Sequence, residues 1–467
     1  MNPFSIGTAD SPPAATLRLS QVIGALSCAL DITEGQPEGH AARSCLIGMK
    51  VAQRVGMNDA DLSALFYALQ LKDLGCSSNA EKVARLFGGD ELQIKRDFKT
   101  SDWPKLTGAL RYILRNLKHH QRLADRMKHF AKIGIDGRRG AREMVKIRCE
   151  RGATIALMFD LPQATARAIH DLDEHWDGAG HPDGLRGLEI DPLARVAGLA
   201  QTVEVFAAAQ GPDAALDMAR ERRGRWFDPE LVDALESLRG DAAFWSGVYG
   251  DDLLAQVRAV EPADRRLDAG DDRLDRIATG FAQVVDAKSS WTRRHSERVT
   301  DLAVGAAARL GTHPEALRWY RRAALLHDVG KLGVSNAILD KQGRLDDNEL
   351  AAMRLHPSFT HRILSRIDGF DQIAEIAASH HERLDGRGYH RGLTGDRLSP
   401  PVRAMVVADM FEAMTAERPY RDTMPIEKVL GILRKDAGTA VCSDAVEALA
   451  AHVDATQYVP GRLDRAA

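Results

Sequence analysis

Histidine and aspartate side chains gather in the second half of this 467-residue chain, where their types suit metal binding. They span about 115 residues, and each lies in or beside a segment with helical periodicity. The set is His295, His327, Asp328, His356, His380, His381 and Asp409. Imidazoles and carboxylates without a thiolate suit iron, manganese or zinc. A single histidine in a helix is more often packed or exposed, but the joint occurrence of these residues favours a metal centre.

The spacing of these residues favours two metal ions. Neighbouring residues on a helix point about 100° apart, so we expect His380 and His381 to contact different ions. Asp328 follows His327 at a predicted helix end, where its carboxylate can bridge both ions. Two ions about 3.5 to 4 Å apart activate water and stabilise a phosphoryl group. The pattern therefore predicts a hydrolytic phosphodiesterase.

The elements that must position these side chains are helices. Runs of β-branched residues are scarce, and apolar residues recur at spacings of three and four, as at Val299, Leu302 and Ala306. The sequence therefore predicts an all-α fold. A hydrophobic share of 44% with 28% charged residues is typical of a folded globular protein, and the length predicts more than one domain.

The two halves of the chain share a repeated pattern. The segments that begin at His40 and His295 correspond, as do Lys72-Asp73 and His327-Asp328, and the separation is 255 in both cases. Residues 174–185 correspond to residues 382–393 at a separation of 208. The change from 255 to 208 indicates a tandem duplication with about 47 extra residues in the first copy.

The composition along the chain predicts where the domains lie. We expect a disordered arm over residues 1–15, which are rich in Pro, Ser and Ala. A first domain is predicted over residues 16–245, with a basic insertion at about residues 91–148. Residues 246–272, which gather charge and lose periodicity, are the predicted linker. The second, catalytic domain is predicted over residues 273–460.

The remaining features favour a cytoplasmic protein. No run approaches 18 apolar residues, and the N-terminus does not resemble a signal peptide, so we expect no membrane partner. The five cysteines lack C-x-x-C spacing and are expected to be small buried side chains in a reducing compartment. The net charge of −3 gives no general reason to expect nucleic acid.

Residues 275–455 resemble the HD-GYP subgroup of the HD phosphohydrolase superfamily. The matching segments are H-S-E-R-V at 295–299, H-D-V-G-K-L-G at 327–333, M-R-L-H-P at 353–357, H-H-E-R-L-D-G-R-G-Y at 380–389, A-D-M-F-E-A-M-T at 408–415 and R-P-Y-R at 418–421. The resemblance implies an all-helical fold, an iron or manganese centre, and hydrolysis of cyclic di-GMP to linear pGpG or GMP.

The resemblance also implies roles for individual residues. The family's metal ligands correspond to His295, His327, Asp328, His356, His380, His381 and Asp409, with Asp328 as the bridging carboxylate. A metal-bridging hydroxide would attack the phosphorus in line, and Lys331 would contact a phosphate oxygen. Arg418 and Arg421 are expected to contact phosphate as well, unless they form a solvated helix end.

Two differences from the family pattern bear on these expectations. The signature Gly-Tyr-Pro reads Gly388-Tyr389-His390, so the loop lacks the proline that would fix φ. We expect His390 to be a surface residue. Trp291 occupies the position at which three-metal members have a glutamate, which implies two divalent ions here, iron or manganese.

The first half lacks most of the ligand set. His40 and Asp73 correspond to His295 and Asp328 and are expected to be packed remnants. The other corresponding residues identified are Lys72, Cys76, Leu172, Asp173 and Gln201. We therefore expect residues 16–245 to bind no metal pair and to form a degenerate copy that senses a signal or forms a homodimer.

Several alternatives remain open from the sequence. Between residues 91 and 148 there are 16 Lys plus Arg and 6 Asp plus Glu, so this insertion either binds an acidic protein, a nucleotide or nucleic acid, or forms a solvated helical face. A second possibility keeps the metal site but changes the substrate to another cyclic dinucleotide or a nucleotide phosphomonoester, and the altered loop at residues 388–390 is its only support in the sequence. A third possibility is a signalling scaffold that binds ligand without turnover.

Overall fold

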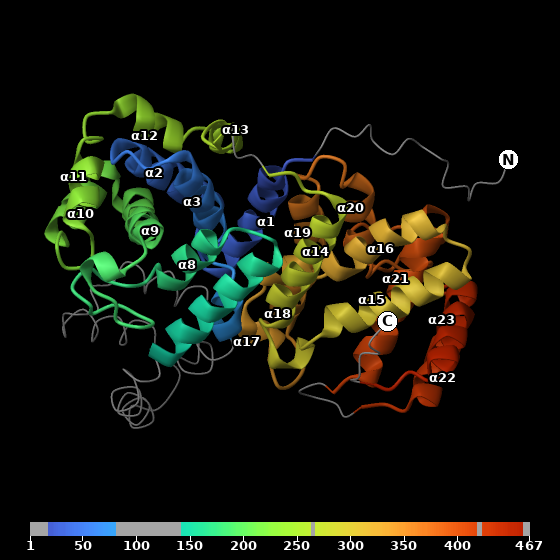
Figure 1. The fold of residues 1–467 in the computed structure, drawn as a ribbon. Coiled ribbons are helices and arrows are strands. Elements are labelled where there is room, and N and C mark those ends of the chain that lie inside the picture. The colour runs from blue at the N-terminus through green and yellow to red at the C-terminus, as the bar shows by residue number, and fades with distance from the viewer. Residues whose placement is uncertain (1–16, 81–141, 263–266, 418–422, 461–467) are drawn as a thin grey trace, which may run out of the picture. The chain divides into compact units, whose positions relative to one another are not determined.

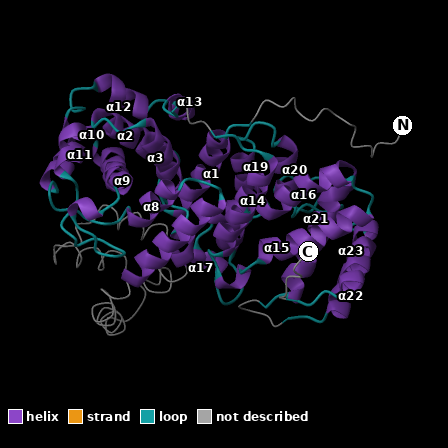
Figure 2. Ribbon diagram, viewed as in Figure 1, coloured by secondary structure: helices purple, strands orange, loops and turns teal. Residues whose placement is uncertain are grey.

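The computed structural model describes residues 17–80, 142–262, 267–417 and 423–460. In these ranges the regular elements are all helices, with only isolated β-bridges between extended residues (Figure 2). The predicted all-α fold is confirmed. The chain forms two compact units, the first over residues 18–269 and the second from Gly270 onward (Figure 1). The predicted arm at 1–15 and most of the basic insertion lie outside the described residues.

The first unit is built around α2, which packs against α3 and α9. An additional helix covers residues 142–158. The labelled helices are α1 (Leu19–Thr33), α2 (His40–Arg54), α3 (Asp59–Leu71), η1 (Cys76–Asn79), α8 (Gln163–Asp171), η2 (Gly187–Glu189), α9 (Pro192–Gln210), α10 (Pro212–Glu221), α11 (Pro229–Glu236), α12 (Ala242–Val248) and α13 (Leu253–Ala259).

The second unit is built around α15, which packs against α16, α21 and α23. Its helices are α14 (Asp271–Asp286), η4 (Ser290–Thr292), α15 (His295–Arg309), α16 (Pro314–Leu326), η5 (Val329–Gly333), α17 (Asn336–Leu339), α18 (Asp347–Met353), α19 (His356–Leu364), α20 (Asp371–Ala378), η6 (Gly395–Arg397), α21 (Pro400–Thr415), α22 (Ile426–Asp436) and α23 (Ser443–Thr456).

The sequence explains the start and the buried face of these helices. Pro314 and Pro400 occupy the first positions of α16 and α21. At this position the N–H that proline lacks would have no partner within the helix, and the fixed φ of proline already suits a helix. Val299, Leu302 and Ala306 are buried along one face of α15, as their spacing predicts. Their burial holds α15 in the core of the unit.

The helices of the two units begin at matching positions. The first residues of α2 and α15 are related by the longer of the two separations found in the sequence, and so are those of α3 and α16. The shorter separation relates the first residue of α8 to that of α20, and the first residue of α9 to that of α21. The repeat therefore extends from the motifs to the helices themselves.

The predicted linker at residues 246–272 differs from the structure. Much of it belongs to the first unit, because it contains α13, which packs on α2, and the buried Glu261. The carboxylate of Glu261 accepts hydrogen bonds from the hydroxyls of Ser20 (2.8 Å) and Tyr67 (2.9 Å). The predicted end of the first domain at residue 245 is therefore too early.

Two further findings concern the whole described chain. None of its helices combines the length and the apolar character that a membrane crossing requires. All five cysteines are buried and free of disulfide bonds, in agreement with the packing role expected from their spacing.

Candidate metal centre

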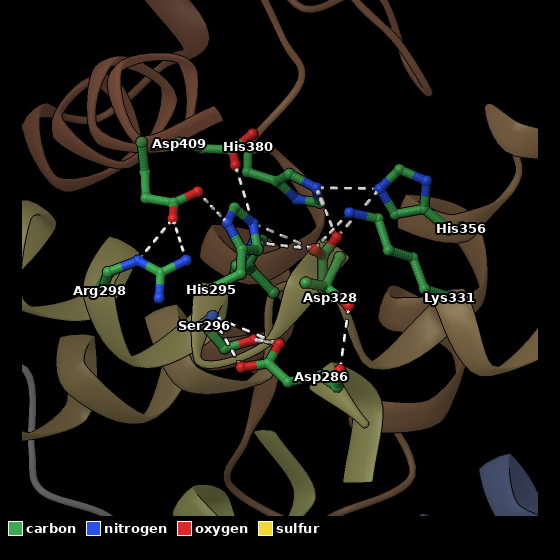
Figure 3. Close-up of polar contacts among 12 residues, drawn as sticks. Asp286, His295, Ser296, Arg298, Asp328, Lys331, His356, His380 and Asp409 are labelled. Atoms are coloured by element: carbon green, nitrogen blue, oxygen red, sulfur yellow. Dashed lines mark hydrogen bonds and ion pairs between the residues drawn. The ribbon is translucent and has the colours of Figure 1, made fainter. Parts of the chain in front are cut away.

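The predicted ligands converge in the second unit, most of them from helix ends (Figure 3). His295 and His356 are the first residues of α15 and α19, His327 is the C-cap of α16, and Asp328 precedes η5. His380 and His381 lie in the turn after α20, and Asp409 lies within α21. We call His295, His327, Asp328, His356, His380, His381 and Asp409 the ligand cluster.

The start of α15 is fixed by a buried carboxylate. Asp286, at the end of α14, accepts hydrogen bonds from the backbone N–H (3.1 Å) and the hydroxyl (2.8 Å) of Ser296 (Figure 3). This contact satisfies a backbone donor that a helix N-terminus leaves without an internal partner. It also holds His295, the residue before Ser296, at the edge of the cluster.

A close backbone approach places His327 and Asp328 beside His356. A Cβ on Gly330 would lie only 2.0 Å from the carbonyl oxygen of His356, so no other residue fits there without movement. The buried Thr360 hydroxyl accepts a hydrogen bond from the Gly330 N–H (3.0 Å) and donates one to the His327 carbonyl (2.9 Å). These bonds hold η5 against α19.

The carboxylate of Asp328 lies between two pairs of imidazoles. Its Oδ2 is 3.5 Å from Nε2 of His295 and 3.3 Å from Nε2 of His327. Its Oδ1 is 3.4 Å from Nε2 of His356 and 3.5 Å from Nε2 of His380. Each oxygen thus has its own set of neighbouring nitrogen atoms, which is the arrangement that a bridging carboxylate requires.

Asp409 and His381 complete the two sides of the cluster. Asp409 Oδ1 is 3.3 Å from His295 Nε2, and its Oδ2 is 3.8 Å from His381 Nδ1. Ligand atoms of His356, His380 and His381 lie within 4.8 Å of one another and could hold a single ion. His380 also forms a possible group with His327 and Asp328, so the expectation that His380 and His381 contact different ions stays a prediction. Its helical premise does not hold, because α20 ends at Ala378 and the two histidines lie in the turn that follows.

The buried atoms of the cluster fit a cation. His295 Nε2, His327 Nε2 and Asp328 Oδ1 have no hydrogen-bond partner among the described residues. Leaving such buried groups unsatisfied costs about 1–3 kcal/mol each, and a divalent ion would satisfy them together. Imidazole and carboxylate donors suit iron, manganese or zinc. These residues therefore form a candidate centre for divalent metal ions.

Comparison with known proteins identifies the family. A family model described as HD domain matches residues 140–231 and 281–442, one range in each unit. The chain belongs to the HD-domain family. The 3'3'-cGAMP-specific phosphodiesterase 3 of Vibrio cholerae is 41% identical over 434 residues, which cover 93% of this chain and 94% of that protein.

Two further relatives of this HD-domain protein are informative. The crystal structure of a cyclic GMP-AMP specific phosphodiesterase from V. cholerae has a TM-score of 0.66 and 38% identity, and the match covers 95% of this chain and all of the other. The cyclic di-GMP phosphodiesterase of Thermotoga maritima is 38% identical over 159 residues, covering 34% of this chain and 43% of that protein.

The electrostatics of the HD-domain cluster keep its aspartates ionised. Burial opposes the charged form of Asp328, but His327 and Lys331 outweigh burial and hold the pKa of Asp328 well below its ordinary value. Burial likewise opposes ionisation of Asp409, but the nearby imidazoles of His295 and His381 hold its pKa well below normal. Both carboxylates are thus available as ligands at neutral pH.

The histidines of the cluster differ in protonation. Burial lowers the pKa of His356 to about 3, so its imidazole is neutral and keeps a lone pair for a metal. Burial and the neighbouring His380 also lower the pKa of His381 well below normal. At His295 burial is outweighed by Glu412, Asp328 and Asp409, which raise its pKa well above normal. The carboxylates therefore favour positive charge here, either on the His295 imidazole or on an ion that takes the place of its Nε2 proton.

The predicted phosphate contacts are only partly described. Lys331, whose side chain is 18% exposed, donates a hydrogen bond to Asp328 Oδ2 at 2.5 Å. Its predicted contact with a phosphate oxygen stays a prediction. Arg418 and Arg421 lie outside the described residues.

The loop after the two vicinal histidines is anchored by Glu382. Its buried carboxylate accepts hydrogen bonds from the backbone N–H groups of Arg391 and Leu393, both at 2.8 Å. The ring centroid of His390 lies 6.3 Å from that of His361, which belongs to α19 but not to the ligand cluster. His390 is half-buried, whereas a surface residue is expected from the sequence.

Tyr389 connects this loop to the cluster. Its ring centroid is 4.7 Å from that of His381, with an angle of 30° between the planes. The guanidinium of the exposed Arg354 lies over the Tyr389 ring, 5.4 Å from the centroid. Aromatic and guanidinium surfaces of this kind can stack a nucleobase.

Sequence reasoning missed the buried Glu412 and the role of Arg298. Glu412, on α21, contacts Nδ1 of His295 through Oε2 and accepts a hydrogen bond from Nε of Arg298 through Oε1 at 2.7 Å. The sequence did contain a signal for them: His40, Arg43 and Glu204 in the first half correspond to His295, Arg298 and Glu412 at the two repeat separations. His295-x-x-Arg298 could have been recognised as a repeated unit.

The first HD-like unit contains positively charged side chains at the corresponding ligand positions. The buried ammonium of Lys72 contacts Asp73, and the guanidinium of Arg148 contacts Asp173. Glu34, Asp73 and Cys76 also form a buried group of possible ligands. Lys72 and Arg148 thus neutralise Asp73 and Asp173. These two aspartates correspond in position to Asp328 and His381 of the ligand cluster.

Proposed function

We propose that this protein hydrolyses the cyclic dinucleotide 3'3'-cGAMP in a metal-dependent reaction. The observation that carries the proposal is the 41% identity with the 3'3'-cGAMP-specific phosphodiesterase of V. cholerae, which extends across both units. The complete ligand cluster in the second unit supports turnover rather than binding alone. This substrate replaces cyclic di-GMP, the substrate expected from the sequence, as the preferred one.

The second unit would hold two divalent ions, iron or manganese, with Asp328 between them. Such ions supply an activated water and positive charge beside the phosphoryl group. In the proposed reaction the ligand cluster would fix the position of this positive charge. Lys331 would hold a phosphate oxygen at the edge of the cluster. Arg418 and Arg421 are proposed as additional phosphate contacts. Cleavage of one phosphodiester bond would give a linear dinucleotide.

Cyclic di-GMP is the second candidate substrate. The observation in its favour is the match between part of the chain and cyclic di-GMP phosphodiesterases, including the one from T. maritima. Both candidates contain guanine, so the two proposals differ in the second base that the site accepts.

A substrate panel tests the proposal. Anaerobically purified protein is incubated with 3'3'-cGAMP, cyclic di-GMP and cyclic di-AMP, and the products are separated by chromatography. We expect the highest kcat/KM with 3'3'-cGAMP and loss of turnover in Asp328→Ala. Asp346→Ala, which changes an exposed helix N-cap, is the control. Preference for cyclic di-GMP would favour the second candidate, and bound metal without turnover would contradict both.

We also propose that the first unit regulates the second or forms a homodimer. The proposal rests on its retained helical framework and its altered ligand positions. The test compares the whole chain with a chain that begins at Gly270, by light scattering and by turnover. If both proteins contain the same number of chains per particle and turn over the substrate at the same rate, this role is contradicted.

A further inference from the structure

Glu412 is the buried group best placed to act on the ligand cluster without belonging to it. Its side chain is 1% exposed and contacts Nδ1 of His295. On the other edge of the same imidazole, Nε2 lies 3.3 Å from Asp409 and 3.5 Å from Asp328 (Figure 3). His295 therefore lies between the carboxylate of Glu412 and the centre of the cluster.

We propose that Glu412 is a positioning residue that orients His295 for metal binding. A neutral imidazole has one N–H and one lone pair, and an ionised carboxylate only accepts hydrogen bonds. Glu412 therefore holds the Nδ1 proton, so that when a metal ion takes the place of the Nε2 proton, the lone pair of Nε2 faces Asp328 and Asp409. The inference rests on the metal centre proposed above. Removing such a supporting contact weakens metal binding about 10- to 100-fold.

Arg298 holds Glu412 in this orientation. Its Nε and Nη2 both contact Oε1 of Glu412, at 2.7 Å and 2.5 Å, while its Nη1 donates to the carbonyl of Arg293 at 2.9 Å. Charge-assisted bonds of this kind are strong and directional. Because Arg298 binds one carboxylate oxygen, the other is directed at His295.

The first unit contains the same three-residue network without the metal-ligand set. Nδ1 of His40 contacts Oε2 of Glu204, and Nε of Arg43 donates to Oε1 of Glu204 at 2.5 Å. There Lys72 occupies the position of a metal-binding histidine. The network therefore also joins α2 to α9, and α15 to α21, independently of metal. Because the first unit has the network without the ligand set, a change to its glutamate measures the effect on helix packing alone.

Glu412→Gln and its matched control Glu204→Gln test the proposal. In Glu412→Gln the amide oxygen faces Arg298, so the amide N–H₂ faces His295 Nδ1 and favours the tautomer with its proton on Nε2. Full-length, metal-free protein is titrated with Mn²⁺ by calorimetry in the absence of substrate. We expect Glu412→Gln to bind Mn²⁺ about 10- to 100-fold more weakly, and Glu204→Gln to bind it as the wild type does.

Two conservative variants guard against misfolding. Glu412→Asp keeps a carboxylate and should restore most of the affinity lost in Glu412→Gln. Arg298→Lys keeps the charge but not the paired contacts, and should weaken Mn²⁺ binding. Wild-type affinity in Glu412→Gln, or equal weakening in Glu204→Gln, would overturn the positioning role. If the wild type itself binds no Mn²⁺, the proposed metal centre is overturned instead.

Discussion

Arg148 occupies in the first unit the position that His356 occupies in the second. A Cβ on Gly75 would lie 1.8 Å from the carbonyl oxygen of Arg148, just as one on Gly330 would lie 2.0 Å from that of His356. Arg148 and His356 are related by the shorter repeat separation, which also relates α8 to α20. The close backbone contact is thus common to both units, whereas the candidate ligand His356 of the second unit corresponds in the first to a cation that contacts Asp173.

Replacing Lys72 should destabilise the first unit. Lys72→Met would leave Asp73, which is 4% exposed, without its buried cation, and breaking a buried pair in this way costs about 3–5 kcal/mol. Lys146→Met is the control, because Lys146 and its partner Glu150 are half exposed, at 47% and 54%, and such pairs contribute about 0–1 kcal/mol. Urea denaturation measures both, and equal effects would contradict a buried structural cation.

Metal removal should affect the two units differently. In the second unit Asp328 and Asp409 would lose the charge that compensates them, whereas Lys72 and Arg148 remain in the first. We expect a chelator to accelerate hydrogen exchange in α16 and α19 and to leave α3 and α8 unchanged. Mass spectrometry of peptides from the four helices measures this. Faster exchange in α3 would indicate that the first unit also binds metal.

Acidification should destabilise the first unit through His175. The ring of His175 stacks on that of Trp226, with centroids 4.2 Å apart. Burial in this position lowers the pKa of His175 to about 4. The unfolded chain binds a proton below about pH 6.5 and the folded chain only below about pH 4, so stability falls as the pH drops between these values. We expect a loss of roughly 2 kcal/mol from pH 7 to pH 5, absent in His175→Phe. Identical pH dependence in both proteins would contradict this.

Tyr389 should contribute to substrate binding through its ring. We expect Tyr389→Ala to lower kcat/KM for 3'3'-cGAMP by about tenfold, because aromatic stacking of a base contributes about 1–3 kcal/mol and the support for Arg354 is lost. Tyr389→Phe keeps the ring and should retain most activity. Steady-state kinetics of both variants test this, and an equally large defect in Tyr389→Phe would assign the effect to the hydroxyl.

The helical fold and the ligand cluster could be predicted because both depend on local patterns. Apolar spacing in α15 identifies its buried face, and the residue types of the motif around His327 and Asp328 indicate metal binding. Their convergence with His356 also followed, since the motif spacing resembles that of a known family.

Other features depend on contacts between residues distant in the sequence. Glu261 joins the first unit by bonding to Ser20, 241 residues away, which no local pattern indicates. The end of α20 at Ala378 frees His380 and His381 from helical geometry, and helix ends are poorly defined by sequence. Arg148 was missed as a counterpart of His356 because it lies at the end of the inserted segment, where the separation has just changed.

The repeated Gly-to-backbone contact separates the framework from the chemistry. Because it uses only backbone atoms of Arg148 and His356, it is the same whether the side chain at that position is a guanidinium or an imidazole. The surrounding side chains are not interchangeable one at a time. A lysine at position 72 beside a bound divalent ion would face strong repulsion, so a lysine and an ion exclude each other at this place in the fold.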